Sequence, residues 1–163
     1  MRRIVLYLLI SVLLIILHTT LMKYLAIGDI VPDILVVWIV YVAIRDGQLA
    51  GTVTGFSIGL AIDLMSGVDG MLGLSTMAKT VCGFAGGYFF NENKTFQTLG
   101  SWRYIVAIVV TSLLHNVIYF IIFLQGTPIG WSGAVLRYGI PTTAYSAAFA
   151  LLPMFVFLRK YSS

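Results

Sequence analysis

Long apolar segments alternate with short polar or glycine-containing turns along the whole chain. The apolar segments cover about residues 4–22, 30–45, 48–65, 71–90, 102–124 and 141–158. A helix needs roughly 20 apolar residues to cross a bilayer, and most segments come close to that length. The pattern predicts an all-α, polytopic membrane protein with six transmembrane helices in a single integral membrane domain, residues 1–163. The first segment is expected to stay as an uncleaved span, because no small-residue cleavage site follows it.

The second segment is shorter than the others. Pro32 and Asp33 near its start suit the first turn of a helix, where the missing proline N–H is not needed and a carboxylate complements the helix dipole. The 15 residues from Ile30 to Ile44 extend about 22 Å, whereas the hydrocarbon core is about 30 Å thick. Either the bilayer thins here, or the turn Arg45-Asp46-Gly47 lies below the membrane interface and is shielded by protein.

Composition supports the membrane assignment and excludes several classes of function. Of 163 residues, 60% are hydrophobic and 10% are charged, and the mean hydropathy is +0.99. These values lie outside the range of soluble domains, and six spans leave no room for a soluble catalytic domain. The net charge of +4 is too small and scattered for nucleic-acid binding. Cys82 is the sole cysteine, so it has no disulfide partner.

The distribution of positive charge predicts the orientation in the membrane. With six spans both termini lie on one side, and that side collects most of the ten Lys and Arg residues. They are Arg2, Arg3, Arg45, Lys94, Arg103, Arg159 and Lys160, whereas Lys23 and Arg137 fall on the other side. Because cytoplasmic loops carry an excess of Lys and Arg, both termini are expected to be cytoplasmic.

Glycines recur at helical spacing in the third and fourth segments. The first series is Gly51, Gly55, Gly59 and Asp63, and the second is Lys79, Gly83 and Gly87. Residues four apart lie on one helix face, so each series forms a narrow ridge of small groups with one charge. Small residues let membrane helices approach closely. We therefore expect the two segments to form a hairpin packed through these glycines.

The polar residues inside the spans all fall in the half of the membrane opposite the predicted cytoplasmic side. They are His18, Asp33, Asp63, Lys79, His115 and Asn116. Intramembrane charges are costly unless they are paired or face a hydrated cavity, so an outward-facing polar pocket is expected. Asp63 and Lys79 are expected to form an ion pair, with Asp33 as the alternative partner. His115-Asn116 is expected to make interhelical hydrogen bonds.

Motifs for catalysis and metal binding are not found in the sequence. The two histidines have neither HxxxH nor HExxH spacing and no pair of cysteines beside them, so no metal site is expected. GxSxG, a P-loop and paired carboxylates are also lacking. The sequence thus predicts neither catalytic residues nor a cofactor.

Motifs in the second to fourth segments resemble the rod shape-determining protein MreD family. In order they are Pro32-Asp33-Ile34-Leu35, Ala43-Ile44-Arg45-Asp46-Gly47, Gly51 through Gly55-Phe56 to Gly59-Leu60, Asp63-Leu64 with Gly67, and Gly73-Leu74 to Ala78-Lys79 with Gly83. One GxxxG is a weak signal, but this ordered series is uncommon among membrane proteins. The other segments agree with the family in hydropathy and order.

The resemblance implies a non-enzymatic, multi-pass protein of the bacterial plasma membrane. It implies membership of the cell-elongation complex, or elongasome, with MreC as direct partner and a role in peptidoglycan synthesis and rod shape. The other members expected are the MreB filament, a RodA-type glycosyltransferase and a class B penicillin-binding transpeptidase. The family's fold is similar to the six-helix substrate-binding (S) components of energy-coupling factor transporters.

Two functions are compatible with these expectations. One is a scaffold that binds MreC, and the other is a transporter component that binds a small molecule or a membrane lipid in the outer pocket. A scaffold should copurify with a single-span partner helix, whereas a transporter component should bind its ligand when purified alone.

Overall fold

The computed structural model describes residues 2–21, 24–27, 30–66 and 72–161. This part of the chain is helical, without strands, apart from connections and one bridging pair, Ile27 and Ile30. The α-helices are α1 (Arg2–Thr20), α2 (Ile34–Asp46), α3 (Gln48–Ser66), α4 (Leu74–Gly86), α5 (Thr95–Leu99), α6 (Trp102–Phe123), α7 (Trp131–Ala134) and α8 (Ile140–Tyr161). Two 3₁₀ turns, η1 (Gly87–Phe89) and η2 (Glu92–Lys94), and a π-helical turn, η3 (Val135–Gly139), complete the order. The predicted all-α class is confirmed.

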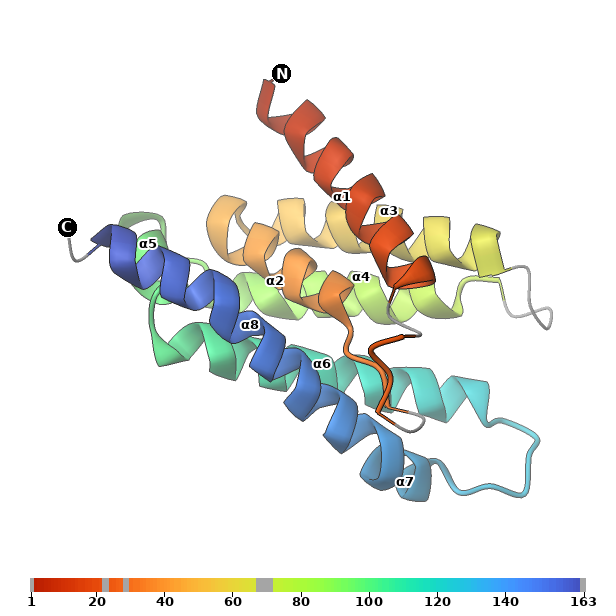
Figure 1. Ribbon diagram of the computed structural model, residues 1–163. Helices are drawn as coiled ribbons and strands as arrows, with labels where there is room; N and C mark the ends of the chain where they lie inside the picture. The colour runs from red at the N-terminus through yellow and green to blue at the C-terminus, as the bar shows by residue number, and fades with distance from the viewer. Residues whose placement is uncertain (1, 22–23, 28–29, 67–71, 162–163) are drawn as a thin grey trace.

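Length divides these helices into two groups. Four helical runs are long and apolar enough to cross a membrane: Arg2–Thr20, Gln48–Met65, Trp102–Phe123 and Trp131–Arg159. By contrast, α2 and α4 have 13 residues each, or about 20 Å of helix against about 30 Å of hydrocarbon. Length and composition thus give four candidate spans in the described part of the chain, where the sequence predicted six spans. Both short helices lie alongside the long ones (Figure 1).

Glycines bring α3 and α4 into backbone contact. A β-carbon on Gly51 would lie 2.8 Å from the Gly83 carbonyl oxygen, and one on Gly59 would lie 2.6 Å from the Ser75 carbonyl oxygen. Between these points, a β-carbon on Gly55 would overlap the Lys79 carbonyl group. Lipid offers no hydrophobic drive for helix association, so close packing of this kind holds the pair together.

The short helix α2 lies at the centre of the bundle. One core cluster includes Val36, Val40, Ile44, Cys82, Leu99, Tyr104 and Ile108, and another includes Ile15, Leu35, Ile39 and Ile58. The two clusters lie on different faces of α2, which explains why this helix is apolar all round. Neighbouring helices therefore cover α2, whereas Asp46 in the turn at its end is exposed.

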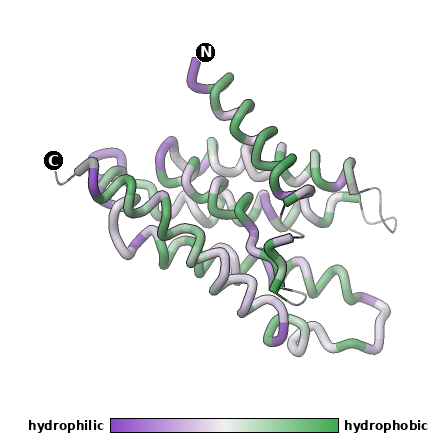
Figure 2. Tube along the Cα trace, viewed as in Figure 1, coloured by the Kyte–Doolittle hydropathy of each residue, from purple (hydrophilic) through white to green (hydrophobic). Residues whose placement is uncertain are grey.

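The first helix, α1, packs loosely at the edge of the bundle (Figure 1), with only Ser11 and Ile15 buried. The Trp38 Nε1–H donates to Ser11 Oγ at 3.0 Å, and the Tyr7 hydroxyl donates to the Asp46 carboxylate. Apolar residues follow the helix along most of its length (Figure 2). An apolar helix with so little protein around it presents most of its surface to lipid or to a partner.

Helices α6 and α8 meet at the π-helical turn η3. The Asn116 side-chain amide donates to the Gly139 carbonyl oxygen and to Thr143 Oγ1, both at 3.2 Å. A β-carbon on Gly139 would lie 3.2 Å from the Asn116 β-carbon, so glycine permits this approach. Single π turns are frequent at functional sites, and this one positions part of the polar cluster described below.

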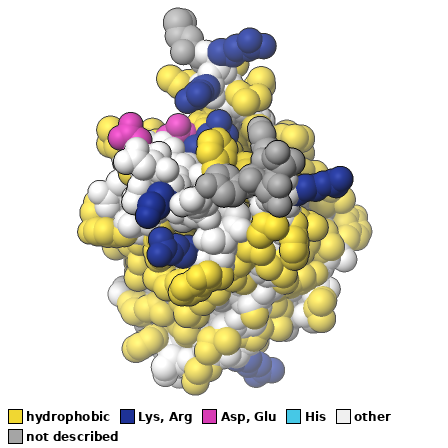
Figure 3. All heavy atoms as spheres, turned by 90° about the vertical axis from the view of Figure 1, so that its left-hand side faces the viewer, with side chains coloured by type: hydrophobic (Ala, Val, Ile, Leu, Met, Phe, Trp, Pro, Cys, Tyr) yellow, Lys and Arg dark blue, Asp and Glu magenta, His cyan; other side chains and the backbone are white. Residues whose placement is uncertain are grey.

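Charged side chains gather at one end of the bundle (Figure 3). The end of α2, α5 and the end of α8 lie at the left-hand end of the bundle, and the start of α1 rises above it (Figure 1). Arg3, Arg45 and Lys94 line a single polar cavity there. These three cations are among the seven Lys and Arg residues that the sequence placed on one side of the membrane.

Candidate functional site

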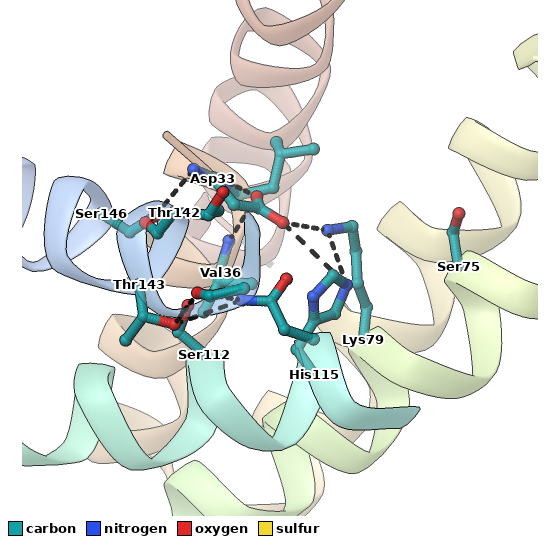
Figure 4. Close-up of polar contacts among 12 residues, drawn as sticks. Asp33, Val36, Ser75, Lys79, Ser112, His115, Thr142, Thr143 and Ser146 are labelled. Carbon is teal, nitrogen blue, oxygen red and sulfur yellow. Dashed lines mark hydrogen bonds and ion pairs between the residues drawn. The ribbon is translucent and has the colours of Figure 1, made fainter. Parts of the chain in front are cut away.

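A buried polar cluster lies where α2, α4, α6 and α8 converge, and Asp33 is its centre (Figure 4). Asp33 precedes α2 and caps it, because Oδ1 accepts from the Leu35 and Val36 amides at 3.0 and 3.1 Å. Its backbone N–H donates to Ser146 Oγ on α8 at 2.8 Å. One residue therefore fixes the start of α2 and joins it to α8.

Lys79 neutralises Asp33 from α4. Its Nζ donates to Asp33 Oδ2 at 2.6 Å, and the Lys79 residue is 4% exposed. The Lys79 ammonium is also 3.5 Å from His115 Nε2 on α6, which in turn lies 4.0 Å from Asp33 Oδ2. A buried charge pair of this kind is stable only if the geometry is good and other hydrogen bonds satisfy the remaining polar atoms.

Asn116, next to His115, extends the polar network toward α8. Thr143 Oγ1 accepts a hydrogen bond from the Asn116 side-chain amide and donates one to the Gly139 carbonyl oxygen at 2.8 Å. It also lies 3.2 Å from Ser112 Oγ. His115 itself stacks on Tyr119, with ring centroids 6.1 Å apart. Of these two adjacent residues, His115 therefore lies beside the Asp33–Lys79 ion pair, whereas Asn116 bonds to the π turn and α8.

Asp63 lies outside this cluster, so the expected Asp63–Lys79 ion pair is not formed. Its carboxylate accepts from the Gly73, Ser75 and Thr76 amides and from the Thr76 hydroxyl, at 2.6–3.0 Å. These donors surround the start of α4, where backbone amides lack helical partners. Lys79 lies farther along α4 and pairs with Asp33, which was the alternative partner.

A cavity of about 440 Å³ adjoins the ion pair and is lined in part by His18, Asp33, Tyr119, Tyr138 and Thr142. In the described part of the chain, His18 Nδ1 is the buried side-chain polar atom without a hydrogen-bond partner. The cavity lies at the Asp33 end of α2, opposite the Arg45 end where the cations gather. This is the place where a polar pocket was expected.

The cluster is suited to holding helices together and to binding a polar group. Among the described residues, no three His, Cys, Asp or Glu side chains are grouped as metal ligands would be. Both Asp33 oxygens are already engaged, one by α2 and one by Lys79. A ligand in the cavity would therefore meet an already neutralised carboxylate and the free imidazole nitrogen of His18.

The turn Arg45-Asp46-Gly47 lies at the opposite end of α2. Gly47 has φ 95°, a left-handed conformation that glycine adopts easily, and its N–H donates to the Ala43 carbonyl oxygen at 3.1 Å. Arg45 donates to the Tyr41 hydroxyl, and its guanidinium lies 5.7 Å from the centre of that ring. Asp46 accepts from Tyr7 on α1. The turn thus connects α1, α2 and α3.

Sequence reasoning missed the contribution of α8 to the cluster. Thr142 and Thr143 lie four and three residues before Ser146, which places both beside it on one side of a helix. Ser146 is fully buried, and its hydroxyl donates to the Thr142 carbonyl oxygen while accepting from Asp33. This polar spacing within an apolar span was the available signal. Trp38, which anchors α1, gave no comparable signal.

Comparison with known proteins gives one match. A family model described as rod shape-determining protein MreD matches residues 1–162. No curated protein and no solved structure matches the chain.

Proposed function

The chain belongs to the rod shape-determining protein MreD family, and from this membership we propose that it is a non-enzymatic membrane scaffold of the cell-elongation complex. Its direct partner is MreC, and through MreC it supports cell-wall synthesis by a RodA-type glycosyltransferase and a class B penicillin-binding transpeptidase beside the MreB filament. A role in rod shape determination is the property of the family, and the named partners and the scaffold mechanism are the proposal.

The proposal includes six spans in the bacterial inner membrane with both termini in the cytoplasm. Coverage of α2 by its neighbours supports it, because non-helical backbone at either end of a short helix is tolerated at membrane depth where protein surrounds it. In intact cells, a membrane-impermeant thiol reagent should not label the Ser163→Cys variant, whereas it should label the Thr127→Cys variant. Labelling of Ser163→Cys from outside would overturn the orientation.

The observation that carries the scaffold function is a groove of about 560 Å³ between α1 and the α2–α3 pair. Its α3 side combines the small residues Ala50, Thr54, Ser57 and Ala61 with the larger apolar residues Leu49, Val53 and Ile58. Its α1 side combines apolar residues with Tyr7 and Ser11, and this helix has few contacts with the rest of the bundle. Small side chains facing a groove let a further membrane helix approach closely, so the groove suits the single span of MreC.

Copurification with MreC tests the scaffold function. Ser57→Trp fills the groove and should reduce recovery of MreC at least tenfold, because a helix interface tolerates little added volume. Leu60→Trp is the matched control, since Leu60 is 40% exposed on the same helix and does not line the groove. Equal recovery of MreC with both variants would show that MreC does not bind in this groove. Failure of the wild-type chain to copurify with MreC would overturn the scaffold function.

One observation favours a second function, the binding of a small molecule as in transporter S components. The cavity beside Asp33 contains the unpartnered His18 Nδ1, and buried polar atoms ordinarily have partners. Under this function a small polar ligand would accept or donate a hydrogen bond at His18. Purified wild type should then retain a small molecule that is lost in His18→Phe, whereas the MreC scaffold requires no such ligand.

A further inference from the structure

Two cavities share Arg45, at the cationic end of the bundle, as a lining residue. The first is a groove of about 380 Å³ between α1, α2 and α8, and Arg45 lines it together with apolar and aromatic residues. The second is a polar cavity of about 270 Å³ lined by the N-terminal turn of α1, the Arg45-Asp46 turn and the η2–α5 segment. We call them the tail groove and the head cavity. Together they pass from an apolar region between membrane helices to a polar region at one bundle end.

The head cavity has more positive than negative groups. Arg3, Arg45 and Lys94 line it, and the acidic residues there are Asp46 and Glu92. Asp46 is engaged by the Tyr7 hydroxyl. Within the described ranges, none of the three cations forms an ion pair with a carboxylate. An anion in the cavity would therefore meet cationic groups whose charge is not already neutralised by direct pairing.

Aromatic rings form one wall of the tail groove. Tyr41 stacks between Trp38 and Phe157, with ring centroids 5.2 and 5.5 Å apart. Pro153 also lines the groove, within the continuous helix α8. The groove surface is almost wholly apolar, so hydrocarbon rather than water is its natural filling.

We propose that the tail groove and the head cavity form one binding site for an anionic phospholipid. The phosphate lies in the head cavity near Arg3, Arg45 and Lys94, and one acyl chain lies in the tail groove between α1 and α8. Basic pockets between membrane helices on the cytoplasmic side bind anionic head groups in this way. The shared residue Arg45 favours a lipid over a partner helix, because a helix across both cavities would place apolar side chains against three cations.

Lipid retention by the purified full chain tests the charge half of the site. The protein is reconstituted in equimolar phosphatidylglycerol and phosphatidylcholine, extracted with mild detergent and weighed by native mass spectrometry. Wild type should retain phosphatidylglycerol preferentially, and Arg45→Gln or Arg3→Gln should lower that preference about fivefold each. Arg103→Gln is the matched control, because it removes the same charge from an exposed residue that does not line the head cavity. Arg3 is itself exposed, so its variant should fold even if Arg45→Gln does not.

A second pair of variants tests the acyl-chain half of the site. Leu6 and Leu9 are exposed leucines on α1, 53% and 64% exposed, and only Leu6 lines the tail groove. Leu6→Trp should reduce retained phosphatidylglycerol several-fold, whereas Leu9→Trp should not. Soluble glycerol phosphate should fail to displace the lipid. Equal retention of the two phospholipids by wild type, equal effects of the two leucine variants, or displacement by glycerol phosphate would overturn the proposal.

Discussion

The Lys79 ammonium lies 2.6 Å from the Asp33 carboxylate, although 46 residues separate them in the chain. The contact brings the start of α2 against the middle of α4, and Ser146 and His115 bring α8 and α6 to the same point. The ion pair itself joins α2 to α4, and contacts of its two members with Ser146 and His115 add α8 and α6. The bundle is organised around this contact as much as around the glycine-packed α3–α4 pair.

Removing one member of the pair should destabilise the protein more than removing both. Asp33→Asn or Lys79→Met leaves an unpaired buried charge and should lower the free energy of unfolding by about 3 kcal/mol. The double variant is neutral at this point, so much of that loss should be recovered. A double-mutant cycle measured by thermal unfolding in detergent gives the coupling energy.

Asp63 supplies the control for that cycle. It engages the start of α4 and does not contact Lys79, so Asp63→Asn combined with Lys79→Met should give additive losses. Additive losses for Asp33 and Lys79 as well would contradict the ion pair as a source of stability. Recovery of stability without recovery of rod shape in cells would assign the pair a further role toward a partner.

Gly55→Ala should be strongly destabilising for so small a change. The added β-carbon would overlap the Lys79 carbonyl group, and the α3 and α4 backbones must separate to admit it. We expect a loss of about 2 kcal/mol, measured by thermal unfolding in detergent. Gly133→Ala is the control, because its β-carbon would meet no atom within 4 Å, and it should be neutral or slightly stabilising. Equal melting temperatures for both variants would contradict backbone contact at Gly55.

The contrast between Gly55 and Asp63 shows what the sequence could and could not predict. A four-residue spacing is a property of one helix, so the glycine ridge on α3 could be found from the sequence alone. The partner of a buried charge depends on how helices are placed around it, and depth alone left Asp33 and Asp63 as alternatives for Lys79. The start of α4 settles which carboxylate pairs with Lys79, because the Gly73, Ser75 and Thr76 amides engage Asp63.

Asp63→Ala should act locally on the start of α4. The Gly73, Ser75 and Thr76 amides would lose their acceptor, and loss of a helix cap costs about 1–2 kcal/mol. Hydrogen exchange of these amides should therefore accelerate while the middle of α4 stays protected. Asp63→Asn keeps one carbonyl acceptor and should give a smaller effect. Unchanged exchange in Asp63→Ala would contradict the capping role.

The length of α2 could not be read from hydropathy for a different reason. Its apolar segment has the composition of a span, but how much of that segment is helical depends on the helices around it. Its 13 helical residues pack against apolar residues of α1, α3, α4, α6 and α8. The polar face of α8 was missed because Thr143 and Ser146 lie in a segment without any charged residue to draw attention to it.

The last prediction concerns the attachment of α1, which forms a wall of both grooves through Tyr7. Trp38→Phe keeps an aromatic ring but removes the Nε1–H that donates to Ser11 Oγ, and Ser11→Ala removes the acceptor. Each should cost about 0.6 kcal/mol, the typical value of a hydrogen bond between membrane helices, and the double variant should cost little more than either one.

Spin labels on Leu9→Cys and Leu152→Cys should report a broader distance distribution between α1 and α8 when α1 is loosened. MreC recovery and phosphatidylglycerol retention should then fall together, because one loosened helix opens both sites. If α1 loosens and one of the two is unaffected, the proposal for that groove is wrong, since an occupant packed against α1 cannot be insensitive to its position.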